Sequence, residues 1–112
     1  MPVRSMYGGD SGHHLFPEPE DIAALDVLLV DLQDVGARYS TFYASMLNCM
    51  FVAAAVGTPV VVLDRRNPIL LQTPFIRFIR QYPIPNRHGL TMGEIAIHLN
   101  ERQRIGCDLG VV

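Results

Sequence analysis

Two short apolar runs, separated by a long segment of helical character, constrain the fold of this chain most strongly. Residues 27–30 and 59–63 are apolar throughout and are each followed by an aspartate, a pattern typical of strands buried on both faces of a parallel sheet. Between them, residues 40–56 contain neither proline nor glycine, which predicts a largely buried helix that stops at Gly57. Since parallel neighbours require a crossover connection, these three segments predict one βαβ unit.

The rest of the chain adds elements on both sides of this unit. Prolines and acids at 17–21 precede residues 22–25, which predicts a short helix. The sequence from Thr91 to Glu94 has the spacing of a capping box, so a helix is expected from there to about Gln103, followed by a strand over 107–112. Residues 65–89 hold four prolines and predict an irregular excursion with one short element near 75–79. This order predicts the α/β class with a mostly parallel sheet and flanking helices.

Composition narrows the classes of function. A chain of 112 residues has the size of one domain. Its composition, 49% apolar against 18% charged residues, excludes intrinsic disorder. The same composition predicts exposed apolar surface, through which we expect the chain to self-associate. A net charge of -2 does not favour nucleic acid or an anionic membrane, and no apolar stretch reaches the length of about 18 residues that spans a bilayer. Cys49 and Cys107 lack metal-ligand spacing, so neither a metal nor another cofactor is expected.

Polar side chains gather in three loops, two directly after the predicted strands and one before the predicted helix at Thr91. Because functional groups of an open parallel sheet collect beyond the carboxyl ends of its strands, we expect these side chains to line one cleft. The candidates are Asp34 and Arg38 in the first loop, Asp64, Arg65 and Asn67 in the second, and His88 and Glu94 in the third.

Each loop also has a simpler interpretation. Asp34 and Arg38 fit a turn with a surface ion pair, and the loop after the second strand fits a solvated turn. The capping box alone accounts for Glu94. His88 precedes a glycine and lies outside any apolar periodicity, so we expect it to be exposed to a cleft rather than buried, although an ordinary loop histidine fits as well.

Three separated motifs resemble those of one enzyme family. They are residues 32–39 (LQDVGARY), 62–69 (VLDRRNPI) and 87–96 (RHGLTMGEIA), and the opening residues 3–8 fit the same pattern. The family is that of the NamZ exo-β-N-acetylmuramidases of bacteria. Two departures stand out: Arg66 replaces a proline of the family motif, and residues 70–74 replace a glycine-rich stretch with an acid.

The resemblance implies a glycoside hydrolase that removes N-acetylmuramic acid from the non-reducing ends of peptidoglycan fragments, in an extracytoplasmic or periplasmic location. Family members are longer, with a Rossmann-like N-terminal domain that carries most catalytic groups and a C-terminal domain that helps to close the cleft. Residues 1–112 are therefore expected to be an incomplete copy of the first domain, without the family's upstream Pro-Glu-His-Gly acid and without the C-terminal domain, and weak or inactive alone.

The family motifs also suggest roles for the candidates, with a muropeptide or another muramic-acid saccharide as partner. Glu94, Asp34 and His88 are the expected catalytic residues, and Glu94 is the preferred cleft carboxylate. The expected substrate-binding residues are Arg38, Asp64, Arg65 and Asn67, with guanidinium groups suited to the lactyl carboxylate of the sugar. A noncatalytic α/β ligand-binding or interaction module is the alternative; a nucleotide-binding protein is the least supported, because no GxGxxG follows a strand.

Overall fold

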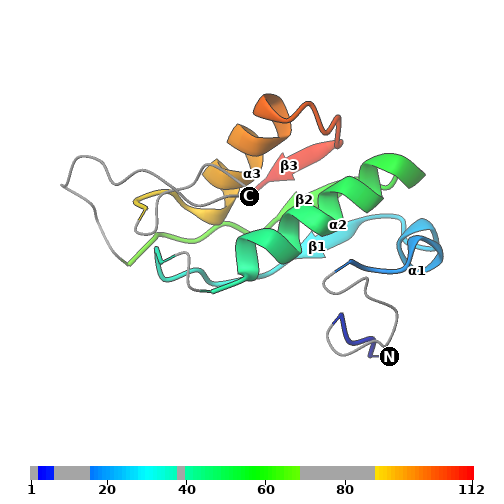
Figure 1. The fold of residues 1–112 in the computed structure, drawn as a ribbon, viewed down its shortest axis with the longest axis horizontal. Helices are drawn as coiled ribbons and strands as arrows, with labels where there is room; N and C mark the ends of the chain where they lie inside the picture. The colour runs from blue at the N-terminus through cyan, green and yellow to red at the C-terminus, as the bar shows by residue number, and fades with distance from the viewer. Residues whose placement is uncertain (1–2, 7–15, 38–39, 69–87) are drawn as a thin grey trace.

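Three parallel strands in the order β1–β2–β3 form the sheet of this chain. The structure, a computed structural model, describes residues 3–6, 16–37, 40–68 and 88–112. The expected element near 75–79 lies outside these residues. The elements are α1 (Pro19–Ala23), β1 (Leu28–Val30), α2 (Phe42–Val56), β2 (Val60–Val62), α3 (Met92–Arg102) and β3 (Leu109–Val111) (Figure 1). The predicted α/β class and parallel sheet are confirmed.

Both long helices cover the same face of the sheet. The sheet residues in the core are Leu28 and Val30 of β1, Val60 and Val62 of β2, and Leu109 of β3, which the strand register places on one side. This arrangement follows from the strand order, because successive crossovers of one hand that advance in one direction put their helices on one face. The buried hydrophobic residues of the helices complete the core, and they are Ile22, Met46, Leu47, Met50, Ala53, Met92, Ile95, Ala96 and Leu99.

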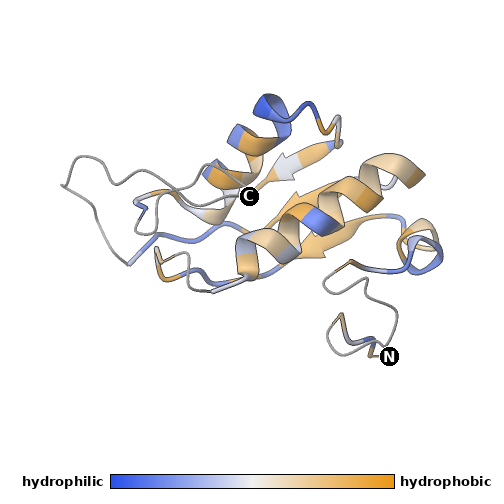
Figure 2. Ribbon diagram, viewed as in Figure 1, coloured by the Kyte–Doolittle hydropathy of each residue, from blue (hydrophilic) through white to orange (hydrophobic). Residues whose placement is uncertain are grey.

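The two helices differ in how much of their surface is apolar. Hydrophobic residues make up most of α2 apart from a hydrophilic stretch near its middle, whereas α3 carries hydrophilic residues toward its carboxyl end (Figure 2). The helix α2 ends at Gly57, whose left-handed backbone conformation lets its N–H bond to the carbonyl of Ala53. The helix α3 begins with the predicted capping box between Thr91 and Glu94. Both sequence signals therefore locate real helix ends.

The prediction that the first strand is buried on both faces is wrong. Val30 is buried, but Leu29, whose side chain points to the opposite face, is 58% exposed, and Val27 is also exposed. The reason is topological: β1 is an edge strand, and among the described elements both long helices pack on the Val30 side. A continuous apolar run therefore marked a strand with only one buried face.

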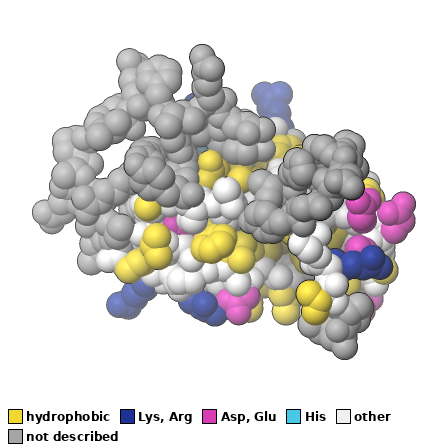
Figure 3. Space-filling model, turned by 60° about the horizontal axis from the view of Figure 1, so that its bottom comes forward, with side chains coloured by type: hydrophobic (Ala, Val, Ile, Leu, Met, Phe, Trp, Pro, Cys, Tyr) yellow, Lys and Arg dark blue, Asp and Glu magenta, His cyan; other side chains and the backbone are white. Residues whose placement is uncertain are grey.

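Exposed hydrophobic side chains also occur on other parts of the described surface. Figure 3 shows several of them on one face of the molecule, with charged side chains mainly toward its margin. Phe16, Leu25 and Phe42 are among the large hydrophobic residues that remain exposed. Within the described part of the chain, no helix has the length and apolar character that a membrane crossing requires.

Substitutions of adjacent residues in β1 test this one-sided burial. We predict that Leu29→Ser changes the free energy of unfolding by less than about 0.5 kcal/mol and lowers self-association in light scattering, because it removes exposed apolar surface. The matched Val30→Ser buries a hydroxyl and leaves a cavity in the core, so it should cost about 2–3 kcal/mol in urea unfolding. Equal losses from the two substitutions would contradict the orientation of the strand.

Candidate active site

Three loops meet beyond the carboxyl ends of β1 and β2, and Gly36 lies where they converge. The N–H of His88 donates to the carbonyl of Gly36 at 3.0 Å, which joins the loop after β1 to the loop before α3. A Cβ on Gly36 would lie 2.5 Å from Asn67 Oδ1 and 3.0 Å from the His88 carbonyl oxygen, and its φ is +76°. Glycine is therefore required here for both space and backbone conformation.

The side chain of Asn67 ties the loop after β2 to the loop before α3. Its Nδ2 donates to the carbonyl oxygens of His88 and Leu90, both at 2.9 Å. Asn67 is buried, so these bonds are shielded from water and fix the path of the loop that leads into α3. This amide is engaged by the backbone of the chain itself.

Asp34 and His88 form a buried acid–imidazole pair inside the loop cluster. The side chains of His88 and Asp34 are 1% and 3% exposed, and His88 Nε2 lies 3.7 Å from Asp34 Oδ1. Asp34 Oδ1 also accepts the N–H of Gly36. The expectation that His88 is exposed to a cleft is wrong, because its backbone is held against Gly36 and its ring is turned toward Asp34.

The two ring nitrogens of His88 face different groups. Nδ1 lies 3.3 Å from the carbonyl oxygen of Leu90, and because a carbonyl can only accept, this contact is a hydrogen bond in the tautomer that carries its proton on Nδ1. Nε2 lies on the Asp34 side of the ring, and among the described residues Nε2 and Asp34 Oδ2 are buried without a hydrogen-bond partner.

Asp64 and Glu94 both engage the first turn of α3. The Asp64 carboxylate accepts the Thr91 hydroxyl at 2.7 Å and the N–H of Gly93 at 2.8 Å. Glu94 is exposed, and its Oε2 accepts the N–H of Thr91 at 2.9 Å. The N–H groups of Gly93 and Glu94, which a helix terminus could offer to a ligand, are thus bonded to side chains of this chain.

Comparison with known proteins identifies the family. A family model described as exo-β-N-acetylmuramidase NamZ, N-terminal, matches residues 1–112. The chain belongs to the NamZ N-terminal family. The resemblance read from the three sequence motifs is thereby confirmed, and these are the motifs that form the loop cluster described above.

Relatives of the NamZ N-terminal family are much longer than this chain. The peptidoglycan β-N-acetylmuramidase NamZ of Bacillus subtilis is 38% identical over 120 residues, which cover all of this chain and 28% of that protein. Two crystal structures of DUF1343 family proteins from Bacteroides fragilis superpose with TM-scores of 0.79 and 0.70, at 36% and 33% identity. They cover 99% and 86% of this chain, which spans 30% of each.

The seven site residues expected from the NamZ motifs occupy distinct settings. The buried group is Asp34, Asn67 and His88, and the group at the start of α3 is Asp64 and Glu94. Arg65 is half exposed and donates to Asp31, an ion pair that links the ends of β1 and β2. Arg38 lies outside the described residues. The structural role of Gly36 was not predicted from the sequence. Its place within the first motif was the one feature that pointed to it.

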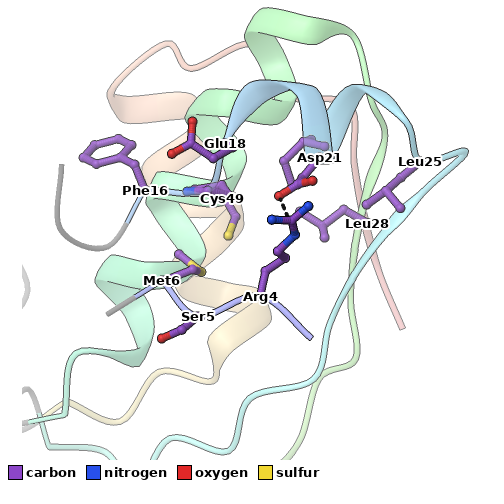
Figure 4. A pocket seen from close by; sticks show the side chains of 11 residues that line it. Arg4, Ser5, Met6, Phe16, Glu18, Asp21, Leu25, Leu28 and Cys49 are labelled. Carbon is purple, nitrogen blue, oxygen red and sulfur yellow. Dashed lines mark ion pairs between the residues drawn. The ribbon is translucent and has the colours of Figure 1, made fainter. Parts of the chain in front are cut away.

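A separate cavity of about 420 Å³ lies at the other end of β1 from the loop cluster (Figure 4). Met6, Phe16, Leu28 and Cys49 contribute apolar walls, and Arg4 forms an ion pair with Asp21 at 3.5 Å. Burial raises the pKa of the Cys49 thiol to about 11, so the thiolate needed for nucleophilic chemistry is scarce at neutral pH. In the described ranges no group of three or more metal-ligating side chains is positioned to hold an ion.

Removal of the buried imidazole should destabilise the chain strongly. We predict that His88→Ala lowers the free energy of unfolding in urea by about 3 kcal/mol, because it leaves a cavity in the buried loop cluster and removes the Nδ1 contact with the Leu90 carbonyl. His98 is exposed on α3, so His98→Ala is the matched control and should stay within about 0.5 kcal/mol of the parent. A His88→Ala chain as stable as the His98→Ala chain would show that the Asp34–His88 pair does not hold the loops together.

Proposed function

We propose that this chain is the N-terminal part of an exo-β-N-acetylmuramidase that releases N-acetylmuramic acid from the non-reducing ends of peptidoglycan fragments. The observation that carries the proposal is the 38% identity, over the whole chain, to the B. subtilis protein named peptidoglycan β-N-acetylmuramidase NamZ. The chain spans 28% of that protein, so the activity proposed is that of the longer enzyme. The convergence of all three motif loops at one end of the sheet supports a common role for them.

Glu94 is the carboxylate that this chain offers to the reaction. Glycosidic cleavage usually requires two carboxyl groups on opposite sides of the scissile bond, one acting as acid and the other as base or nucleophile. Glu94 is exposed, and its carboxylate accepts the N–H of Thr91, whereas Asp34 is buried. An exposed carboxylate can reach a sugar; one that is 3% exposed cannot without movement of its loop.

The buried Asp34–His88 pair and the amide of Asn67 support the loop that leads to Glu94. Asp34 and His88 act as positioning residues rather than as groups that touch the sugar, because each is almost wholly buried. Asn67 has the same role, since its amide donates to two backbone carbonyls of the loop that leads to Glu94. Rigid support of this kind favours catalysis because a displacement of about 1 Å in a reacting group can cost about 100-fold in rate.

Arginine side chains are suited to the acidic part of the substrate. N-acetylmuramic acid carries a lactyl carboxylate, and a planar guanidinium binds a carboxylate with two parallel hydrogen bonds. Arg65 is half exposed beyond β2, and its ion pair with the exposed Asp31 is weak enough to open for a ligand. Arg65 and Arg38 are therefore the proposed ligands for the lactyl group.

A hybrid enzyme tests the role of Glu94. Residues 1–112 would replace the matching segment of the B. subtilis relative, and release of product from a chromogenic β-N-acetylmuramide would be measured. Glu94→Gln keeps the capping box, since glutamine is accepted at that position, but removes the ionisable group. We predict that kcat/KM falls by more than about tenfold, a loss of about 1.4 kcal/mol in transition-state stabilisation, while the melting temperature is kept.

The matched control changes an exposed glutamate at the other end of the same helix. Glu101→Gln removes one charge from α3 and should leave kcat/KM within about twofold of the parent hybrid. If Glu94→Gln behaves like Glu101→Gln, Glu94 is only a helix cap. If the parent hybrid folds and binds N-acetylmuramic acid but releases no product, the alternative of a noncatalytic binding module holds instead.

A further inference from the structure

Asp64 is the residue at which three elements of the fold meet. It follows β2, its backbone N–H donates to the carbonyl of Val112 at 2.7 Å, and its carboxylate reaches the first turn of α3. Both carboxylate oxygens are used there, Oδ1 by the N–H of Gly93 and Oδ2 by the Thr91 hydroxyl. A side chain held in this way is anchored between the end of the sheet and the start of α3.

The bond from Thr91 to Asp64 fixes which way the Thr91 hydroxyl points. Because the hydroxyl donates its proton to Asp64, its lone pairs are free to accept, and one of them accepts the N–H of Glu94 at 3.2 Å. Glu94 returns a bond through its carboxylate to the N–H of Thr91. Asp64 and Glu94 are thus connected through a single threonine, without direct contact between their side chains being needed.

Close packing around Gly93 keeps Asp64 and α3 in register. A Cβ on Gly93 would lie 2.9 Å from Asp64 Cγ and 2.4 Å from Val111 Cγ1, so any larger residue would push the helix away from the sheet. The absence of a side chain lets the N–H of Gly93 approach the carboxylate to 2.8 Å. The position of the first turn of α3, and therefore of Glu94, depends on this contact.

We propose that Asp64 is a positioning residue for Glu94 and not a ligand of the substrate. This inference rests on the proposed function, since Glu94 is given its catalytic role there. Each oxygen of Asp64 accepts a hydrogen bond from the first turn of α3, and these two bonds hold the carboxylate toward the start of that helix. An aspartate that holds the cap of α3 raises the fraction of enzyme in which Glu94 is correctly placed, so its loss lowers kcat rather than weakening substrate binding.

Kinetics of the hybrid enzyme separate these two roles of Asp64. Asparagine at this position offers an N–H where the Thr91 hydroxyl now donates, so Asp64→Asn should lower kcat by at least about tenfold and change KM by less than about threefold. A rise in KM with unchanged kcat would make Asp64 a substrate ligand and overturn the inference. Unchanged kcat and KM would overturn it as well. Asp26→Asn, at an exposed aspartate before β1, is the control and should alter neither constant.

Substitutions of Thr91 keep the test valid if the Asp64 variant does not fold. Thr91→Val removes the hydroxyl that connects the two carboxylates and should lower kcat by about the same factor as Asp64→Asn, whereas Thr91→Ser keeps the hydroxyl and should recover most of that loss. Equal kcat values for the Val and Ser variants would contradict a connection through the hydroxyl.

Amide hydrogen exchange of the 112-residue chain provides a readout that does not depend on activity. Asp64→Asn should increase the exchange rate of the Glu94 amide by at least about fivefold relative to Asp26→Asn, because the Thr91 hydroxyl that accepts this N–H is no longer oriented. If exchange is faster in the 112-residue chain but the hybrid enzyme is inactive, the proposed function is contradicted and the link from Asp64 to Glu94 is not. An unchanged exchange rate would contradict the link itself.

Discussion

The buried amide of Asn67 is the interaction on which the arrangement of the site depends. It joins two loops that are separated by 21 residues of sequence, and it does so by donating to the backbone carbonyls of His88 and Leu90. Gly36 lies against it because no Cβ fits there, and the carbonyl of Gly36 in turn accepts the N–H of His88. Without this amide, the loop into α3 loses its side-chain hydrogen bonds to the loop after β2.

The same contacts separate the carboxylates of the site by environment. Asp34 is enclosed with His88, Asp64 is bonded to the first turn of α3, and Glu94 is exposed at the cap. Acid–base chemistry is commonly divided among carboxyl groups in this way, because burial and hydrogen bonding decide which group can meet a substrate. The proposed muramidase role therefore assigns contact with the sugar to Glu94 and support to the buried groups.

Features with local causes could be predicted from the sequence, whereas features caused by distant contacts could not. The end of α2 at Gly57 and the capping box of α3 are set by residues within one helical turn, so the pattern located both. Burial of His88 depends on Asp34 and Gly36, more than 50 residues earlier, and no periodicity reports such a contact. The bonds from Asp64 to Thr91 and Gly93 span 27 and 29 residues and were likewise not predictable.

The number of buried faces of a strand could not be predicted from its sequence either. The apolar run at β1 predicted burial on both faces, but such a run does not show whether helices cover one face of the sheet or both. Leu29 is exposed because α2 and α3 pack on the Val30 side. The resemblance to NamZ identified which residues to consider at the site. It did not indicate that Asn67 and Asp64 bond to the chain itself, because a motif gives positions and not hydrogen-bond partners.

A crystal structure of the hybrid enzyme with bound N-acetylmuramic acid would test the location of the site most directly. The sugar is predicted to lie beyond the carboxyl ends of β1 and β2, with a carboxylate oxygen of Glu94 within hydrogen-bond distance of it and the Asp34–His88 pair still buried beneath. A sugar bound elsewhere, for example in the cavity beside Arg4 and Phe16, or a Glu94 carboxylate bonded only to Thr91, would contradict this account of the molecule.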